Sequence, residues 1–453
     1  MQKVKPSLLR GFDQEYLPAE QLHFNRLVDI IRRNFELYGF LPIETPSAER
    51  REILTSKGGV EKEIYALTRL AEAEDDDAST KGALRFDLTV PLARYVAMRE
   101  RELAFPFRRY QIQRVWRGET PQANKGRFRE FYQCDIDIIG REKLSYLAEA
   151  EIPSVIYSVF KEMAIGEFKI RINNRKVLRG LMEMYDVPPQ LMPEVLRVLD
   201  KIEKIGYGEA MQQLAALRLT TDECRDLIHH LSEKGSTDEL LRDLAGLRGA
   251  KSDAFAQGVK ELTEVVAAIR GFGVPDSAFS VDLGIVRGLD YYTGTIYETT
   301  LTGAPELGSI CSGGRYDDLA SYFTDTKLPG VGISIGLTRL FSKLREANLL
   351  QPLPRTPAEV LVTTMDQQHL DKYLKMATAL RAAGINTEVY LEAAKLGNQL
   401  TYADRKGFRL ALIAGETEFA SDKVQIKDLS SKQQHMIATD RVVSAVKELL
   451  RMA

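Results

Sequence analysis

Two runs of strand-forming residues, YQIQRVW and FYQCDIDII, lie within residues 108–140 and are separated by a cluster containing Gly, Pro, Asn and Lys. Such a cluster between two β-type runs predicts an antiparallel pair of strands joined by a loop. Because side chains alternate along a strand, Gln133, Asp135 and Asp137 fall on one face, opposite a mostly apolar face. A sheet that contains this pair therefore has an entirely polar surface along its second strand.

The polar face of this strand has two interpretations. On an arbitrary strand it is a solvated outer surface. Here four charged residues flank the same hairpin, namely Arg117, Glu119, Arg127 and Arg129. Guanidinium groups bind phosphate through two parallel hydrogen bonds, and carboxylate or amide groups opposite them can hold an amine or an imidazole. The pattern therefore favours a site for a nucleotide beside a cationic metabolite.

Three further segments could contribute to such a site. In IVRGLDYYTGTIYE, residues 285–298, Arg287 interrupts an apolar β pattern, either as half of an ion pair or as a functional group. In SGGRYDDL, residues 312–319, two glycines form a tight turn or let the backbone approach a ligand. The glycines of GVGISIGLTRL, residues 330–340, do not match a dinucleotide-binding loop. The sequence also lacks a P-loop and a Ser-centred nucleophile elbow.

The order of strand-like and helix-like patterns divides the chain into domains. Residues 174–270 are helical in pattern and rich in Leu, Glu and Arg, which predicts an inserted helical domain. The proline-rich segment QPLPRTP, residues 351–357, predicts a linker. Residues 358–453 then alternate strands and helices, as a small α/β domain does. Residues 1–173 and 271–350 remain as the core that contains the hairpin.

Composition narrows the class of protein further. The chain has 453 residues and a net charge of -2, so any nucleic-acid surface has to be a local patch. Its apolar runs are too short to cross a bilayer and its first residues lack a secretory signal, so we expect a cytoplasmic protein without a membrane span. Three widely spaced cysteines fit a reducing compartment. Neither they nor the five histidines have zinc-ligand spacing, so no protein-only metal site is expected.

Several segments carry a resemblance to a known family, the class II aminoacyl-tRNA synthetases. GFDQEYLP and YGFLPIETP resemble the region of motif 1, RVWRGETPQANKGRFREFYQCDIDIIG resembles motif 2, and GISIGLTRL resembles motif 3. RGLDYYTGTIYE and SGGRYDDL resemble the two segments peculiar to the histidyl-tRNA synthetases. The resemblance runs through nearly the whole chain and is weakest in the helical insertion.

This resemblance implies an α/β (α+β) fold, with a class II antiparallel-sheet catalytic core, the helical insertion and a C-terminal mixed α/β anticodon-binding domain. Motif 1 implies a homodimer. KLGNQLTYADRKG and VQIKDLSSKQQ resemble the anticodon-binding module. Five cations there could follow an RNA backbone, although lysines on a solvated face are the alternative: Lys395, Arg405, Lys406, Lys423 and Lys427.

Carried over residue by residue, the resemblance implies two neighbouring sets of ligands. The set expected to bind ATP is Arg117, Glu119, Arg127 and Arg339. The set expected to bind histidine is Asp87 and Thr89 at its amino group, Gln133 at its carboxylate or amine, and Asp137, Tyr291 and Tyr292 at its imidazole. The expected catalytic residues are Arg117 and Arg287, both beside the α-phosphate.

The implied reaction joins histidine to tRNA(His) in two steps. ATP with bound Mg²⁺ first converts histidine to its adenylate, and the adenylate then acylates the 3′-hydroxyl of the tRNA. Two departures from the commonest family pattern are Thr338 in motif 3, where many relatives carry Glu, and the long motif 2 loop TPQANKG. The first bears on the nucleotide contacts, and the second on the loop that meets the tRNA acceptor end in the family.

Two other functions share parts of the pattern. A non-catalytic paralogue, such as the regulatory subunit of ATP phosphoribosyltransferase, would bind histidine as a signal, but it would be expected to lose the phosphate-binding arginines and the anticodon domain. A synthetase for another small amino acid would share motifs 1 to 3 but would not be expected to carry RGLDYY and SGGRYDD. The sequence therefore favours the histidine enzyme.

Overall fold

The computed structural model describes residues 4–56, 61–69, 81–122, 126–217, 219–232, 235–247, 252–286, 292–392 and 394–451. Contacts between residues divide the chain into two compact units. One consists of Met1–Gln14 with Leu27–Leu350, and the other of Glu15–Arg26 with Gln351–Ala453. A long helix, α1 (Pro18–Leu37), contains residues of both. Within the described parts of the chain, no helix combines the length and apolar character needed to cross a membrane.

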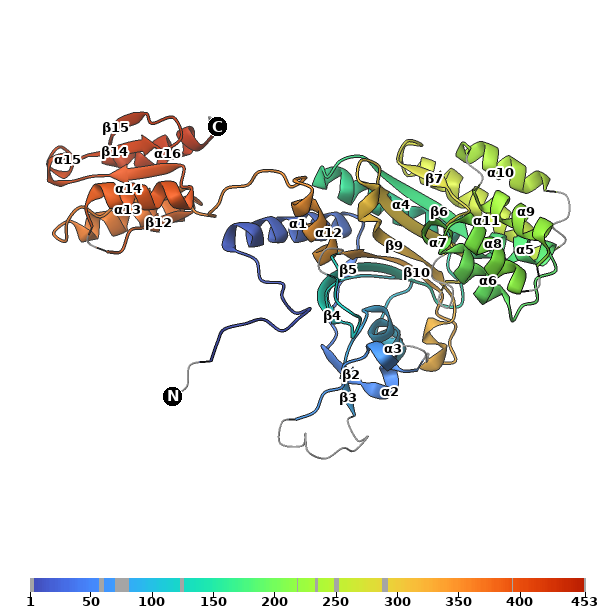
Figure 1. Cartoon of the computed structure of the whole chain (residues 1–453). Coiled ribbons are helices and arrows are strands. Elements are labelled where there is room, and N and C mark those ends of the chain that lie inside the picture. Colours follow the sequence, from blue (N-terminus) through green and yellow to red (C-terminus); the bar gives the residue numbers. More distant parts are fainter. Residues whose placement is uncertain are drawn as a thin grey trace. The chain divides into compact units, whose positions relative to one another are not determined.

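The first unit is built on one large sheet (Figure 1). Its strands are β1 (Leu41–Pro42), β4 (Phe107–Trp116), β5 (Glu130–Ile139), β6 (Phe168–Asn174), β7 (Phe279–Val281), β8 (Thr295–Leu301), β9 (Ser309–Tyr316) and β10 (Gly330–Gly336). Their order in the sheet is β1-β4-β5-β10-β9-β8-β6-β7. All pairs are antiparallel except the two at the edges, where β1 runs parallel to β4 and β7 parallel to β6. The antiparallel-sheet core predicted from the sequence is confirmed.

The hairpin predicted within residues 108–140 is also confirmed, as the antiparallel pair β4 and β5. Its polar face is present, but the side chains on it are buried rather than solvated. Gln133, Asp135 and Asp137 expose only 8%, 3% and 4% of their surface. Burying carboxylates costs free energy unless they are paired or bind a ligand, so this face has a use other than solubility.

The opposite face of the sheet is apolar and lies under α4 (Tyr146–Met163). Ile136 and Ile333 sit directly across from each other on this face and are buried. The Tyr297 hydroxyl, in the same row of the sheet, donates a hydrogen bond of 2.6 Å to the Glu149 carbonyl oxygen of α4. Helix α12 (Leu337–Glu346) follows β10 directly and packs along β5. The apolar face of the sheet thus packs against helices, and the polar face is left to form a site.

Between β6 and β7 the described residues are helical, in agreement with the pattern of residues 174–270. The helices are α5 (Arg175–Met184), α6 (Met192–Leu199), α7 (Ile202–Ile205), α8 (Tyr207–Ala216), α9 (Thr221–Ser232), α10 (Thr237–Gly246) and α11 (Asp253–Gly271). They gather beside the β6–β7 end of the sheet (Figure 1), where α11 packs against α4 and α5, and α10 against β7.

A small element precedes the hairpin and positions Asp87. It consists of β2 (Ala48–Arg50), α2 (Arg51–Leu54), β3 (Gly82–Leu84) and α3 (Thr89–Arg99). Arg85, which is 1% exposed, fastens it to β4. Arg85 Nη1 donates to the Thr45 carbonyl oxygen at 2.5 Å and to Gln113 Oε1 at 3.0 Å, and its Nε donates to the Arg114 carbonyl oxygen at 3.0 Å. These bonds fix the backbone two residues before Asp87.

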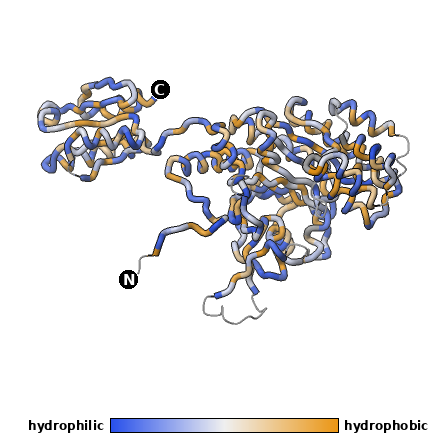
Figure 2. Tube along the Cα trace, in the orientation of Figure 1, coloured by the Kyte–Doolittle hydropathy of each residue, from blue (hydrophilic) through white to orange (hydrophobic). Residues whose placement is uncertain are grey.

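The second unit contains a five-stranded mixed sheet in the order β12-β11-β13-β14-β15. Its elements are β11 (Val360–Val362), α13 (Leu370–Ala382), β12 (Thr387–Val389), α14 (Leu396–Lys406), β13 (Leu410–Ile413), α15 (Glu416–Ala420), β14 (Lys423–Asp428), β15 (Gln434–Ala438) and α16 (Val442–Arg451). Val360 and Val362 join the apolar cluster of α13 and α16, and Leu361 joins that of α14. The sheet therefore lies between two layers of helices. Figure 2 shows the resulting alternation of hydrophobic and hydrophilic residues along the chain.

Two elements of this unit were not anticipated, α15 and β15. Helix α15 is only five residues long. Strand β15 alternates exposed and half-buried residues at the edge of the sheet, but its sequence QHMIA does not alternate polar and apolar residues in step with that pattern. Short elements at an edge are specified more by their neighbours than by their own sequence.

The buried arginine offers a test of the fold. Arg85→Leu should destabilise the first unit by about 3 kcal/mol, because several buried acceptors lose their donor. Thermal unfolding measured by calorimetry would show the change. The exposed Arg101→Leu is a matched control whose effect should stay within about 0.5 kcal/mol. Equal effects of both substitutions would show that the Arg85 hydrogen bonds do not hold this region.

Candidate active site

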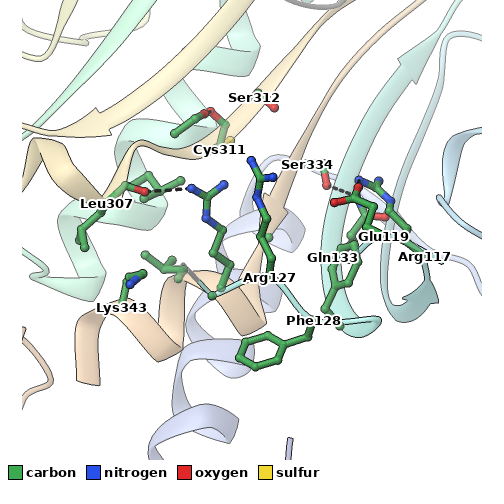
Figure 3. Close-up of a pocket in the computed structure, with 17 residues that line it drawn as sticks. Arg117, Glu119, Arg127, Phe128, Gln133, Leu307, Cys311, Ser312, Ser334 and Lys343 are labelled. Carbon is green, nitrogen blue, oxygen red and sulfur yellow. Dashed lines mark hydrogen bonds and ion pairs between the residues drawn. The ribbon is translucent and has the colours of Figure 1, made fainter. Parts of the chain in front are cut away.

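A cavity of about 380 Å³ lies beside the β4–β5 hairpin. Its lining includes all four residues expected to bind ATP and one expected to bind histidine, namely Arg117, Glu119, Arg127, Arg339 and Gln133. In Figure 3, Arg117, Glu119 and Gln133 lie on one side of the cavity and Lys343 lies on the other. Among the described lining residues four cations face one carboxylate, so the cavity is complementary to a polyphosphate.

Local contacts hold two of the guanidinium groups in place. Arg117 Nε donates to the Phe86 carbonyl oxygen at 3.0 Å, and its guanidinium carbon lies 5.1 Å from the centre of the Phe131 ring. Arg339 Nη2 donates to the Leu307 carbonyl oxygen at 3.1 Å. Because these contacts fix the guanidinium groups at the cavity, a phosphate would meet donors that are already oriented.

The hairpin loop approaches Arg339 closely, and this approach requires glycine at position 126. Gly126 has a φ of +64°, and a Cβ at this position would lie 2.9 Å from Arg339 Cγ. Any other residue would be strained and would push Arg339 away. Residues 123–125 of the motif 2 loop lie outside the described residues.

Thr338, the departure in motif 3, has a structural role. Its side-chain oxygen accepts a hydrogen bond of 2.8 Å from the Tyr132 backbone N–H, and the residue is buried. The bond joins the start of α12 to β5. It thereby fixes the spacing between Arg339 and Gln133, which are the next residues along the chain on either side of the contact.

A second cluster lies further along the polar face and is centred on Asp137. Arg109 Nη2 lies 2.5 Å from Asp137 Oδ2, and the Tyr316 hydroxyl donates to Asp137 Oδ1 at 2.7 Å. All three residues are buried. The carboxylate of Asp137 is thus oriented by one cation and one hydroxyl, which is how a recognition group is held rigid.

Glycine makes room for this carboxylate on the neighbouring strand. Gly332 of β10 pairs with Asp137, and a Cβ on it would lie 2.1 Å from Asp137 Oδ1. Gly314 of β9 pairs with Gly332, and a Cβ there would lie 2.9 Å from a ring carbon of Tyr292. The two glycines therefore provide the space that Asp137 and Tyr292 occupy above the sheet.

The segment SGGRYDDL also anchors Tyr292 through its neighbour. The Thr293 N–H donates to the Arg315 carbonyl oxygen at 2.8 Å, and the Thr293 hydroxyl donates to Asp317 Oδ2 at 2.5 Å. The Arg315 guanidinium in turn donates to Asp317 and to the buried Glu149 of α4. The glycine-rich segment is therefore a strand that fastens the tyrosine segment to the sheet, rather than a tight turn.

Burial raises the pKa values of the acidic groups in this cluster, and the nearby positive charge opposes this effect only in part. Burial raises the pKa of Asp135 to about 7 and that of Asp137 to about 6, and in both the Arg109 guanidinium opposes the effect. Burial, together with the nearby carboxylates of Asp137, Asp135 and Asp87, raises the pKa of the Tyr292 hydroxyl. The described part of the cluster thus sets one cation, Arg109, against the carboxyl groups of Asp87, Asp135 and Asp137, and it suits a ligand that brings positive charge or N–H donors.

The remaining expected residues are distributed as follows. Asp87 lies close enough to Asp135, Asp137 and Tyr292 to act on their pKa values, and its carboxylate accepts a hydrogen bond of 3.2 Å from the Val90 N–H. Thr89, the first residue of α3, follows two residues later. Arg287 and Tyr291 lie outside the described residues. Gln133 of the cavity lining donates through its Nε2 to Ser334 Oγ at 2.8 Å, and it lies on the same face of β5 as Asp137.

Reasoning from the sequence did not assign roles to Arg109, Tyr316, Ser334 or Asp135. A signal was available for Arg109. The antiparallel register places it directly opposite Asp137, on the same polar face. Tyr316 and Ser334 come from strands distant in the sequence, so only the sheet order brings them to this cluster.

The raised pKa of Asp135 leads to a testable dependence on pH. Ionising this buried group costs folding free energy as the pH rises from the ordinary carboxyl pKa of 3.8 to about 7, and an amide has no such cost. The melting temperature of ligand-free Asp135→Asn, relative to that of the unmodified protein, should therefore increase between about pH 5.5 and about pH 8. The exposed Asp325→Asn is the control. A difference that stays constant or falls with pH would show that Asp135 is not destabilised by ionisation.

Comparisons with known proteins agree with this geometry. The histidyl-tRNA synthetase family matches residues 13–340, and an anticodon binding domain matches residues 359–449. A histidine–tRNA ligase of Xanthomonas axonopodis pv. citri is 48% identical and is covered over 97% of its length by 99% of this chain. A histidine–tRNA ligase of Clostridium tetani is 47% identical, with 98% of each chain covered.

Solved structures give the same result. The crystal structure of histidyl-tRNA synthetase from Nostoc sp. PCC 7120 has a TM-score of 0.91 and 43% identity, with 100% of both chains covered. A Bacillus halodurans protein described as an ATP phosphoribosyltransferase regulatory subunit/histidyl-tRNA synthetase has a TM-score of 0.72 and 22% identity, over 88% of this chain and 97% of its own, which shows a common fold alone. The identity of 43% and more to histidine–tRNA ligases and a histidyl-tRNA synthetase holds over nearly the full length, whereas the identity to the Bacillus halodurans protein is 22%. This chain therefore belongs to the histidyl-tRNA synthetase family.

Proposed function

We propose that this chain activates histidine with ATP and transfers it to tRNA(His), and that the cavity and the Asp137 cluster form its single active site. The observation that carries the proposal is the polar face of β5, which carries Gln133 in the lining of the cavity and, four residues further on, Asp137 in the acidic cluster. An arginine-lined cavity at one end of that face suits a triphosphate. An acidic cluster at the other end suits an amino acid with a basic side chain.

In the first step the histidine carboxylate attacks the α-phosphorus of ATP and pyrophosphate leaves. The protein contributes mainly positioning and charge neutralisation, because phosphoryl chemistry of this kind needs little covalent help. Arg117 would neutralise the α-phosphate, Arg127 the outer phosphates, and Arg339 would stack on adenine beside Glu119. Arg287 is proposed as the second catalytic cation at the α-phosphate, on the resemblance of RGLDYY to the family's segment.

Histidine recognition would use the Asp137 cluster. Asp137, oriented by Arg109 and Tyr316, can accept a hydrogen bond from an imidazole N–H. The Tyr292 hydroxyl and, by the resemblance, Tyr291 would complete the imidazole pocket. Asp87 and Thr89 would lie at the amino group. A side chain that lacked a ring N–H would not form this further hydrogen bond to Asp137, which disfavours other amino acids of similar size.

Magnesium is proposed to arrive with ATP rather than to occupy a site built by the chain alone. Among the described residues lining the cavity, Glu119 is the carboxylate that could reach such an ion, and phosphate oxygens would supply other ligands. When bound, Mg²⁺ would neutralise charge on the phosphates. The chain's own arginines would hold the same phosphates in line for attack.

The second unit is proposed to bind the anticodon, with residues 351–357 as the linker and 358–453 as the domain. Cationic residues on the sheet and on α14 support contact with an RNA backbone. Of these, Lys406 already pairs with Glu388 at 2.9 Å, so Lys395, Arg405, Lys423 and Lys427 are the better candidates. We also propose a homodimer formed through motif 1, a catalytic core of residues 1–173 and 271–350 with an insertion at 174–270, and a cytoplasmic location.

The proposed function predicts a strict amino-acid requirement. Pyrophosphate exchange into ATP, measured with each of the twenty amino acids, should respond to histidine alone. Omitting Mg²⁺ should abolish the exchange. A response to threonine or proline equal to that to histidine would overturn the proposed specificity.

Arg117 offers a test of the nucleotide site. Arg117→Ala should slow histidine-dependent exchange by on the order of 10² to 10³, because one charged donor to the α-phosphate is lost. Arg114→Ala is the matched control, since Arg114 lies three residues before Arg117, within β4, but pairs with Glu130 outside the cavity. Exchange by Arg117→Ala within twofold of the control would remove Arg117 from the mechanism.

A further inference from the structure

Arg129 flanks the hairpin, yet it is not among the described residues that line the arginine-lined cavity. Its contacts lie with the start of the hairpin loop instead. The Arg129 carbonyl oxygen accepts a hydrogen bond of 2.8 Å from the Arg117 N–H, and Arg129 Nε donates to the Glu119 carbonyl oxygen at 3.3 Å. Arg129 therefore fixes the backbone of two residues that are proposed to lie at the α-phosphate and at the adenine.

Arg129 is in turn held by Gly11, a residue from the start of the chain. The Arg129 N–H donates to the Gly11 carbonyl oxygen at 2.8 Å. A Cβ on Gly11 would lie 2.9 Å from both Cγ and Cδ of Arg129, and 3.1 Å from Cβ of Pro121. Gly11 thus packs on the aliphatic part of the arginine and on the hairpin loop, more closely than a residue with a side chain could.

The backbone around Gly11 is shaped for this contact. The Phe12 N–H donates to the Leu9 carbonyl oxygen at 2.9 Å, which closes a turn of residues 9–12 with Gly11 in third place. Gly11 has a φ of +86°, and a turn with a positive φ at this position requires glycine. Residues 4–10 are exposed, whereas Gly11 is buried. The turn therefore presents one residue to the hairpin, which is not expected of a segment that only adds to the core.

A second contact fastens the same turn beside the hairpin. The Phe12 ring meets the Tyr65 ring edge to face, with 5.8 Å between the ring centres. Tyr65 belongs to residues 61–69, and in that segment the Glu63 carbonyl oxygen accepts a hydrogen bond of 2.8 Å from the Gly118 N–H. This glycine lies between the two residues that are proposed to bind the nucleotide. The turn and residues 61–69 thus contact each other, and both hold the hairpin where the nucleotide-binding residues begin.

We propose that Gly11 is a positioning residue for ATP. The turn around it holds Arg129, and Arg129 sets the positions of Arg117 and Glu119. This inference rests on the proposed function and adds to it a residue outside the cavity. A misplacement of about 1 Å in groups that orient reacting atoms can cost on the order of 10² in rate, so a contact that fixes their backbone matters to the reaction.

The test compares Gly11→Ala with Gly273→Ala, each in the full chain. Gly273 has a φ of +83°, close to that of Gly11, but a Cβ on it would meet no described atom within 4 Å. Both substitutions therefore strain the backbone equally, and only the first pushes against Arg129. In histidine-dependent pyrophosphate exchange, Gly11→Ala should raise the KM for ATP about tenfold, and Gly273→Ala should leave it within about twofold. The KM for histidine should stay within about twofold in both variants.

The two KM values separate positioning from stability. Histidine binding should not follow ATP binding, because Arg109 and Tyr316 orient Asp137 through bonds of their own. A turn that only stabilised the fold would lower the folded fraction, and hence kcat, without changing either KM, and the melting temperatures of both variants would show such a loss.

Two results would overturn the proposal. One is an unchanged KM for ATP in Gly11→Ala, and the other is an equal rise of the KM for ATP and the KM for histidine. Absence of histidine-dependent exchange in the unmodified protein would instead refute the proposed function itself.

Discussion

The buried ion pair between Arg109 and Asp137 is the interaction on which the site depends. Both side chains are buried, and the pair is 2.5 Å apart. Removing two charges from water costs about as much free energy as their mutual attraction regains, so such a pair stabilises the fold little by itself. Its effect is to hold one carboxylate in a fixed orientation, together with the Tyr316 hydroxyl. A fixed acceptor of this kind can distinguish an imidazole N–H from other groups of similar size.

The rest of the sheet is arranged around this pair. Gly332 and Gly314 leave space above β10 and β9, and Asp137 and Tyr292 fill it. Hydrogen bonds among Thr293, Asp317 and Arg315 fasten the segment that carries Tyr292. At the other end of the face, contacts of Arg117 with Phe86 and of Arg339 with Leu307 hold the guanidinium groups of the arginine-lined cavity. Side chains that are held in this way lose less conformational freedom when they bind a ligand.

Much of this architecture could be predicted from the sequence. Alternation along residues 131–139 gave the hairpin and its polar face, and the arginines around it indicated a phosphate site before any fold was known. The buried state of that face could not be read from alternation, because a solvated strand has the same pattern. The position of Arg109 could have been predicted, since strand register alone pairs it with Asp137. The positions of Tyr316 and Ser334 could not, because they depend on the order in which distant strands join the sheet.

The spacing of the motifs also did not predict two features that depend on packing. Thr338 was noted as a departure from the commonest pattern, and the structure gives it a hydrogen bond to the Tyr132 N–H that links α12 to β5. Alternation also could not show that the three polar residues of β5, Gln133, Asp135 and Asp137, are buried.

The central claim is that one ligand spans the cavity and the Asp137 cluster. A crystal structure with a non-hydrolysable sulfamoyl analogue of histidyl-adenylate would measure this directly. We expect the adenine beside Arg339 and the imidazole within hydrogen-bond distance of Asp137, and an analogue bound with its imidazole away from Asp137 would contradict the account.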